Sequence, residues 1–252
     1  MDENIQQKLL KQFIKISDKK WLRGVNNTTN SVGLTFEYLL NKKTDSMYFP
    51  DYQGIEIKCT QRFSRYPISL FSLSFDGPNL YEMNRLLITY GKQDVKYNEK
   101  LQLQGSLFVN KYNLINNNLF KLKIDKENRK IIVAIYDLNY QLLEEKTYID
   151  FETIKSRLEL KLTNLAVIYA SKKIIDNNLY FRYYLIEIYK LKSFNKFIEL
   201  LEKDYIKVSI IGRVSRTGIE EGRQRNKNLV FSISKDQIDL LFRKVIEYNS
   251  DF

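Results

Sequence analysis

Two carboxylates and a lysine lie within eight positions of the chain, at Asp51, Glu56 and Lys58. A proline before Asp51 and a glycine soon after it indicate a turn. Residues 55–58 then alternate apolar and charged side chains with the period of a β-strand. Glu56 and Lys58 are therefore expected on one face of this strand and two isoleucines on the other. Asp51, at the mouth of the turn, can reach the face of the charged pair.

Such a group is suited to the hydrolysis of a phosphodiester bond. The carboxylates of Asp51 and Glu56 are hard oxygen ligands for Mg²⁺, and bound Mg²⁺ lowers the pKa of a water molecule. Lys58 would orient the attacking water or stabilise the charge that develops on the phosphate. The alternative is a solvated strand face with a weak ion pair between Glu56 and Lys58, which is common in amphipathic strands.

The flanking segments extend this group. Residues 32–40 have apolar side chains at helical spacing and a single acidic residue, Glu37. Glu37 is either a third carboxylate of the site or a partly exposed charge. Arg62 lies just after the strand and is a candidate contact to DNA. A second apolar run at 68–73 follows a turn and predicts an antiparallel hairpin with residues 55–58.

Three motifs occur in order along this part of the chain: Gly33-x-Thr35-Phe36-Glu37-x-x-Leu40, Pro50-Asp51-x4-Glu56-x-Lys58 and Leu70-Phe71-Ser72. Together they resemble the restriction endonucleases of the MvaI/BcnI type, which are themselves similar to the mismatch-repair nicking enzyme MutH. Trp21, the polar loop 26–31 and the pair Tyr90-Gly91 continue the resemblance. It is strongest from Trp21 to Gly91, and towards the C-terminus it is limited to the order of the elements.

The resemblance implies an α/β fold of the PD-(D/E)XK type, with a restriction-endonuclease-like mixed β-sheet core flanked by helices and a second DNA-recognition lobe. It implies Mg²⁺-dependent hydrolysis of duplex DNA at a short specific sequence. It places the metal ligands on Asp51 and Glu56, the catalytic lysine on Lys58 and an auxiliary acidic group, also at the metal, on Glu37. The implied partners are double-stranded DNA and a cognate DNA methyltransferase of the same restriction–modification system, and the enzyme is expected to be a monomer.

Composition restricts the chemistry further. The chain has 252 residues with 41 Lys+Arg against 30 Asp+Glu, and this net charge of +11 indicates a polyanion or an anionic membrane surface as partner. The absence of histidine excludes histidine triads, bases and metal ligands. The single cysteine fits a reducing cytoplasm. No apolar run approaches a membrane span and the N-terminus is not a signal peptide, so we expect a cytoplasmic protein without a membrane partner.

A polar segment near the C-terminus is the candidate for base recognition. Residues 212–228 lie between predicted strands at 205–211 and 229–233 and carry three glycines and five Lys/Arg. Arginine can bond guanine, and glutamine or asparagine can bond adenine, in the major groove. The alternative is a mobile, solvated hairpin tip. The related enzymes have a His-Asp-His-Gly-type stretch here that this chain lacks. The candidate DNA contacts are Lys207, Arg213, Arg216, Arg223, Gln224, Arg225, Asn226 and Lys227.

The remaining pattern predicts helices at 2–16, from about 79 to 90, at 151–158, at 194–203 and at 235–248. The last helix is expected to turn Ile238, Leu241, Phe242 and Ile246 inwards. Strands are predicted at 101–109, 120–124, 130–136, 144–149, 165–170 and 179–188. We expect a catalytic lobe of residues 1–110 with part of 120–190, and a DNA-recognition lobe over roughly 191–252.

Three other functions compete with a restriction endonuclease. A MutH-like nicking enzyme would use the same residues and need an activating partner. A catalytically silent DNA-binding module has no reason to keep several carboxylates together, since clustered like charges cost stability unless a cation sits among them. A membrane-surface or RNA-binding protein would explain only the positive charge.

Overall fold

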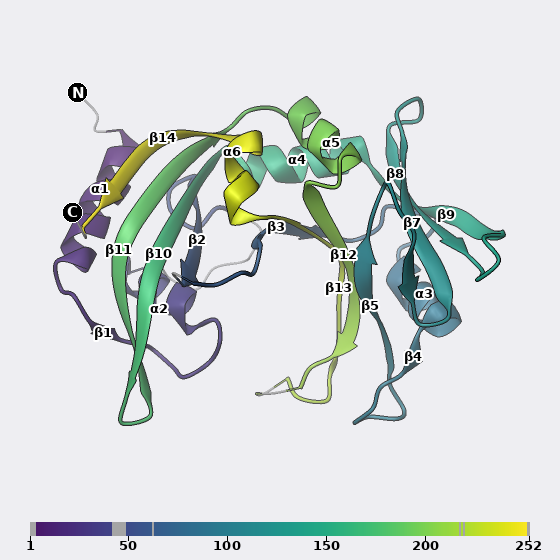
Figure 1. The fold of residues 1–252 in the computed structure, drawn as a ribbon, viewed down its shortest axis with the longest axis horizontal. Helices are drawn as coiled ribbons and strands as arrows, with labels where there is room; N and C mark the ends of the chain where they lie inside the picture. Colours follow the sequence, from purple (N-terminus) through teal and green to yellow (C-terminus); the bar gives the residue numbers. More distant parts are fainter. Residues whose placement is uncertain (1–3, 42–48, 62, 217, 219, 251–252) are drawn as a thin grey trace. The chain divides into compact units, whose positions relative to one another are not determined.

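The structure is a computed structural model that describes residues 4–41, 49–61, 63–216, 218 and 220–250. The chain folds into two compact units, each assembled from separate segments (Figure 1). Unit 1 comprises Met1–Ile68, Leu158–Ser193 and Ile238–Phe252, and unit 2 comprises Ser69–Arg157 and Phe194–Gln237.

Unit 1 is built on a mixed five-stranded sheet. Its strands are β1 (Leu22–Arg23), β2 (Glu56–Gln61), β10 (Asn164–Ile175), β11 (Asn178–Leu191) and β14 (Phe242–Asn249). The order is β1-β11-β10-β2, and β14 also pairs with β11. β2 runs parallel to β10, whereas the other pairs are antiparallel. A parallel pair needs a long crossover, and the first segment of unit 2 together with α4 (Phe151–Leu162) lies in the chain between β2 and β10.

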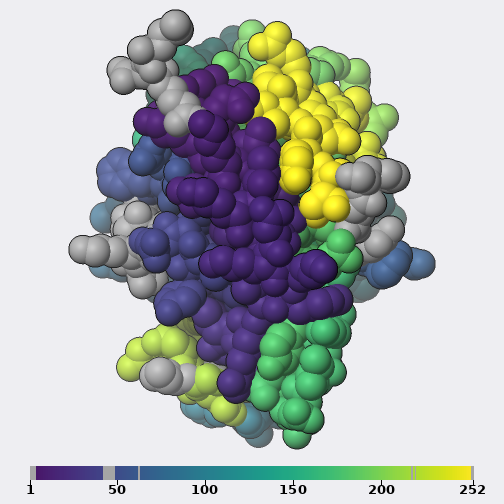
Figure 2. Space-filling model, turned by 90° about the vertical axis from the view of Figure 1, so that its left-hand side faces the viewer, coloured from purple at the N-terminus to yellow at the C-terminus, as the bar shows by residue number. Residues whose placement is uncertain are grey.

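One face of this sheet buries the core of unit 1. Helices α1 (Ile5–Ser17) and α2 (Ser31–Leu39) contribute Phe13 and Phe36, which pack with Ile57 and other buried side chains of the sheet. The ring of Phe13 also meets the edge of Tyr248 on β14 at a centroid distance of 6.1 Å. Figure 2 accordingly shows α1 (purple) beside the C-terminal segment (yellow). Ile55 and Ile57 therefore face the core as predicted.

The prediction of a helix over 235–248 is wrong in its second half. A 3₁₀ turn, η1 (Lys235–Gln237), and the short helix α6 (Ile238–Leu241) are followed by β14, which pairs antiparallel with β11. Of the four residues predicted to face inwards, Ile238, Leu241 and Phe242 are buried, and Ile246 is partly buried against the core of unit 1. As a strand, this segment supplies hydrogen-bond partners to backbone groups along one edge of β11, which a helix here would leave without them, and this tertiary pairing overrides the helical spacing.

The described part of unit 2 contains two sheets, the helices α3 (Glu82–Tyr90) and α5 (Phe194–Glu202), the first part of α4, and η1. The first sheet has the order β3-β13-β12-β5-β4, formed by Ile68–Leu73, Gln224–Ile233, Ile206–Val214, Leu101–Leu107 and Lys92–Gln93. The second has the order β6-β7-β8-β9, formed by Asn113–Ile115, Asn118–Asp125, Lys130–Tyr136 and Leu142–Asp150. The rings of Phe71, Phe197 and Phe231 pack against one another in the core of unit 2.

The hairpin predicted from residues 55–58 and 68–73 is wrong. β2 lies in the sheet of unit 1 and β3 in a sheet of unit 2, so the two strands do not pair. Each strand instead pairs with a strand distant in sequence, β10 for β2 and β13 for β3, and this pairing buries the start of β2 and most of β3.

The α/β class agrees with the prediction. The chain passes from one unit to the other after Ile68, Arg157, Ser193 and Gln237. The predicted catalytic lobe, 1–110 with part of 120–190, and the predicted recognition lobe over roughly 191–252 stay predictions. Residues 238–252 belong to unit 1 because β14 completes its sheet. No helix within the described ranges is long and apolar enough to cross a membrane.

Candidate active site and nucleic-acid interface

A tight turn places Asp51 at the start of β2. Tyr52 and Ile55 exchange backbone hydrogen bonds of 2.9 and 2.8 Å across it. Gln53 (φ 44°) and Gly54 (φ 90°) both adopt left-handed backbone conformations, which glycine accepts without strain. The Oδ2 atom of Asp51 accepts the backbone N–H of Ile57 at 2.9 Å. The turn therefore fixes the Asp51 carboxylate against β2, close to the charged pair that follows.

Glu56 is the buried acid of this site, with 1% of its surface exposed. Its Oε1 atom accepts hydrogen bonds from Lys58 Nζ at 2.6 Å and from Lys161 Nζ at 2.9 Å. Its Oε2 atom is buried and has no hydrogen-bond partner, and it is the sole such side-chain atom in the described part of the chain. An unpartnered buried carboxylate oxygen is an open position for a cation.

Two other buried glutamates, Glu82 and Glu187, have hydrogen-bond donors on both carboxylate oxygens, unlike Glu56. Glu82 is equally buried, but Arg85 and Thr147 donate to its Oε1 and Asn79 donates to its Oε2. Glu187, on β11, accepts Lys244 on Oε1 and two tyrosine hydroxyls on Oε2. These carboxylates are satisfied within the protein and need no ligand.

The described residues do not form a preformed metal site with three side-chain ligands. Among the residues that the structure describes, no three acidic or cysteine side chains gather closely enough to hold a metal ion. Asp51 and Glu56 supply hard oxygens at the turn and on β2, and the open Oε2 of Glu56 suits Mg²⁺, which commonly binds through one or two carboxylates and keeps several waters. Asp51 and Glu56 therefore fit Mg²⁺.

The charge of Glu37 affects a side chain on β2, the thiol of Cys59. Burial raises the pKa of the Cys59 thiol, the carboxylates of Glu37 and Asp51 raise it further, and the ammonium of Lys58 lowers it. Cys59, on β2, therefore lies within electrostatic reach of three of the four predicted site residues. The Cys59 side chain itself packs against the hydrophobic core of unit 1.

The position of Glu37 depends on how α2 is held. The ring of Phe36 meets the edge of Tyr183 on β11 at a centroid distance of 5.0 Å. The Tyr183 hydroxyl donates to the backbone carbonyl of Val32 at 2.8 Å, and the Thr35 hydroxyl accepts the backbone N–H of Val25 at 3.1 Å. α2 is thus bound to the sheet along its buried face, and Glu37 remains partly exposed.

Lys161 is the site residue that the sequence did not reveal. It lies in the last turn of α4, which extends to Leu162 rather than ending at residue 158 as predicted. It is 105 positions from Glu56. Because α4 leads into β10, the parallel neighbour of β2, Lys161 reaches Glu56 only through the tertiary fold. No local sequence signal could have identified it.

The segment predicted as a recognition loop is mostly a β-hairpin. β12 continues to Val214 and β13 begins at Gln224, so the connection is shorter than residues 212–228. Arg213 stands opposite Arg225 in the strand register, and Lys227 follows on β13. The pKa of Lys227 is lowered by burial and by the positive charges of Arg225 and Arg213. We call Arg213, Arg225 and Lys227 the cationic cluster.

Within the described residues, the cationic cluster has no acidic partner, in contrast to its neighbours. Arg216 forks onto both oxygens of buried Asp94 at 2.7 and 2.6 Å, and Arg223 pairs with Glu220 at 2.8 Å. Three like charges held together cost stability unless an anion compensates them.

The other predicted DNA contacts are placed as follows. Lys207 is exposed on β12. Gln224 donates to Asn226 at 3.1 Å, and Asn226 donates to Asn84 of α3 at 2.7 Å. Arg62 lies outside the described residues. The hairpin is therefore supported by α3 through Asn226 and Asn84.

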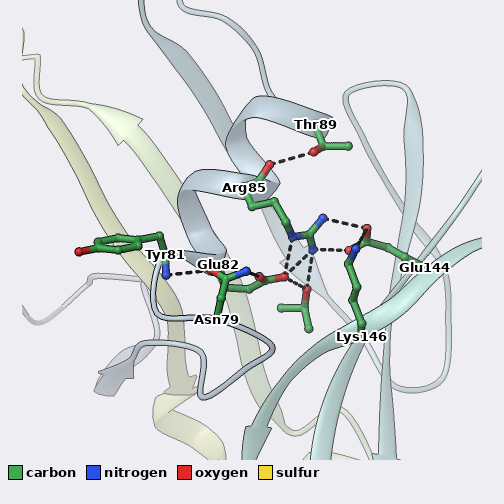
Figure 3. Close-up of polar contacts among 8 residues, drawn as sticks. Asn79, Tyr81, Glu82, Arg85, Thr89, Glu144 and Lys146 are labelled. Carbon is green, nitrogen blue, oxygen red and sulfur yellow. Dashed lines mark hydrogen bonds and ion pairs between the residues drawn. The ribbon is translucent and has the colours of Figure 1, made fainter.

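A closed polar network holds α3 in turn (Figure 3). Arg85 donates to Glu82 at 3.0 Å and to Glu144 of β9 at 2.9 Å. Burial would lower the pKa of Arg85, but these two carboxylates outweigh it and raise the pKa. The Thr147 hydroxyl donates to Glu82 at 2.5 Å and accepts from Arg85 at 3.0 Å. Because its acceptors are used internally, we interpret this network as structural.

Comparison with known proteins places the chain among restriction endonucleases. It belongs to the MvaI/BcnI restriction endonuclease family, whose sequence model matches residues 10–242. Membership of this family supports a site-specific DNA endonuclease. No curated protein matches the chain.

Two solved structures of restriction endonuclease MvaI share the fold. The complex of MvaI with its cognate DNA substrate gives a TM-score of 0.89 at 24% identity, covering 97% of this chain and 99% of that chain. MvaI in the absence of DNA gives a TM-score of 0.59 at 24% identity, covering 97% and 98%. The predicted family resemblance and the restriction-endonuclease-like fold class are confirmed.

Proposed function

We propose that the protein is a type II restriction endonuclease that hydrolyses both strands of duplex DNA at a short specific sequence, with Mg²⁺ as cofactor and a PD-(D/E)XK-type site. The observation that carries the proposal is the buried, unpartnered Oε2 atom of Glu56. A buried acceptor without a donor costs about 1–3 kcal/mol, and more for a charged group. Binding of a cation there would recover this free energy.

The roles of the site residues follow from their positions. Asp51 and Glu56 would hold Mg²⁺, which when bound lowers the pKa of water and stabilises charge on the phosphate. Lys58 is the more exposed of the two lysines on Glu56, with 28% of its side chain accessible against 11% for Lys161. Lys58 would therefore donate to the scissile phosphate or orient the attacking water. Glu37 would act as an auxiliary acid through its charge.

DNA recognition would belong to unit 2. The cationic cluster combines arginines with a partly desolvated lysine, and an anion would relieve its internal repulsion. Arginine side chains on a β-hairpin suit a major groove, which admits a two-stranded ribbon. We expect Arg213 and Arg225 to contact bases or phosphates directly. Arg216 and Arg223, whose guanidinium groups already bond acids, are more suited to shaping the hairpin.

The wider setting follows from the same proposal. An enzyme of this kind needs a cognate DNA methyltransferase that protects the host's own sites. We expect it to act as a monomer on duplex DNA. Its MutH-like alternative, a nicking enzyme with an activating partner, uses the same residues and differs in cutting one strand.

Digestion of unmethylated phage DNA by the purified protein tests this function. Parallel reactions contain Mg²⁺, Ca²⁺ or no divalent metal, and the ends of the products are sequenced. Discrete double-strand fragments in Mg²⁺ alone are expected. Nicks in one strand would instead support the MutH-like alternative. Intact DNA with a clear gel shift of duplex would refute an autonomous restriction endonuclease and support either a silent DNA-binding module or an enzyme that needs an activating partner.

A further inference from the structure

We infer that Lys161 is a positioning residue of the active site: it holds Oε1 of Glu56 so that Oε2 is presented to the metal ion and Lys58 is left available to the substrate. This inference rests on the proposed function. Among the described residues, Lys161 is the one hydrogen-bond partner of the Glu56 side chain that comes from outside the motif around β2.

The burial of the two lysines separates their roles. Both donate to the same oxygen, Lys58 at 2.6 Å and Lys161 at 2.9 Å. The side chain of Lys161 is 11% exposed and that of Lys58 is 28% exposed. Leu158 and Leu162, which are fully buried on the same helix, anchor the turn that carries Lys161. Lys161 is thus the fixed partner, and Lys58 is the one that solvent and a phosphate can reach.

The charges on Glu56 explain why two lysines are needed. If Lys58 were the only counter-ion, turning its ammonium towards a phosphate would leave the buried Oε1 without a donor. Removing one partner of a buried pair leaves an uncompensated charge, which is strongly unfavourable. With Lys161 in place, Glu56 keeps one donor on Oε1 throughout. The carboxylate also keeps its orientation, because a donor on one oxygen fixes the direction of the other.

The direction in which Mg²⁺ affinity changes when Lys161 is replaced distinguishes a positioning role from electrostatic repulsion between Lys161 and the metal ion. Lys161 is a cation near a proposed cation site, so repulsion alone predicts that its removal strengthens Mg²⁺ binding. Loss of a group that orients a metal ligand instead weakens metal binding, typically about 10- to 100-fold. The inference predicts the second outcome.

The experiment compares the full-length wild type with Lys161→Met and Lys161→Arg. Mg²⁺ affinity is measured by isothermal titration calorimetry of the DNA-free protein, and DNA affinity by gel shift without divalent metal. We expect Lys161→Met to bind Mg²⁺ at least about 10-fold more weakly, with a lower kcat and an unchanged DNA affinity. Lys161→Arg keeps a charged donor and should recover most of the Mg²⁺ affinity.

Lys244→Met is the matched control. It also removes an ammonium from a buried glutamate of unit 1, because Lys244 Nζ donates to Glu187 at 2.5 Å. Glu187 keeps its two tyrosine donors, Tyr169 and Tyr189. Lys244→Met should lower thermal stability without changing Mg²⁺ affinity.

Two results would overturn the inference: a folded Lys161→Met protein that binds Mg²⁺ as tightly as wild type or more tightly, or an equal loss in Lys244→Met. If Lys161→Met does not fold, Lys161→Gln, which is shorter and uncharged, takes its place with the same expected loss of Mg²⁺ affinity. Failure of the proposed function is distinguishable, since the wild type would then neither bind Mg²⁺ nor cut DNA.

Discussion

Replacing Arg225 by glutamine tests whether Arg225 contacts DNA or stabilises the folded protein. Arg225 belongs to the cationic cluster, where burial lowers the pKa of Lys227 and the positive charges of Arg225 and Arg213 lower it further. Removal of the Arg225 charge relieves repulsion in the free protein. The variant should therefore be at least as stable as wild type, and any loss should be confined to DNA binding.

The size of the loss depends on what Arg225 contacts. A bidentate contact to a base contributes about 1–3 kcal/mol of discrimination, which corresponds to roughly 5- to 150-fold in Kd. A contact to phosphate contributes no sequence preference. Its loss makes the negative slope of log K for DNA binding against log salt concentration shallower by about 0.9. The two cases therefore differ in specificity and in salt dependence.

The assay measures Kd for a cognate and a random duplex at several salt concentrations in Ca²⁺, together with thermal unfolding. Arg216→Gln is the control from the same hairpin. Asp94 is buried and would lose both guanidinium donors, so this variant should have a lower melting temperature. Wild-type affinity of Arg225→Gln for both duplexes, or a loss of stability as large as that of Arg216→Gln, would refute the role of the cationic cluster.

Three further predictions concern the two units separately. Lys58→Ala should abolish cleavage while leaving DNA affinity in Ca²⁺ within about twofold, and a parallel loss of affinity would show that Lys58 is structural. Glu37→Gln should shift the Mg²⁺ concentration for half-maximal cleavage, and an unchanged Mg²⁺ dependence would remove Glu37 from the site. Burial tends to raise the pKa of Glu144, but Arg85 outweighs it and lowers the pKa below its ordinary value of 4.5. Stability from this pair is thus present above about pH 4.5 and lost as pH falls through the lowered pKa, and denaturant unfolding from pH 7 to pH 3 should show a smaller acid loss in Glu144→Gln.

Local sequence was sufficient for the strand that carries Glu56 and Lys58. The alternation at residues 55–58 depends only on the two-residue period of a strand, so it correctly placed Ile55 and Ile57 in the core and left Glu56 and Lys58 for the other face. The turn at Asp51 was equally local, because the proline before it and Gly54 after it determine the backbone there.

The predictions from sequence patterns were wrong where a segment pairs with a strand that is distant in the chain. Residues 68–73 follow β2 closely in the chain, yet they pair in unit 2, and residues 242–249 have helical spacing, yet they complete the sheet of unit 1. In both cases the partner strand is distant in sequence. Backbone hydrogen bonds to such a strand are invisible to periodicity, which reports only which side chains share a face.

The sequence by itself determined the chemistry: the absence of histidine, the acid-and-lysine motif at 51–58, the excess of positive charge and the family these motifs resemble. Tertiary structure alone decided the electrostatic state of that motif. It brought Lys161 to Oε1 of Glu56 and Arg216 to Asp94. Within the part of the chain that the structure describes, it left Oε2 of Glu56 without a hydrogen-bond partner and the cationic cluster without an acidic one. The physical reason is that burial and pairing of a charge depend on residues far away in the chain, whereas its chemical identity does not.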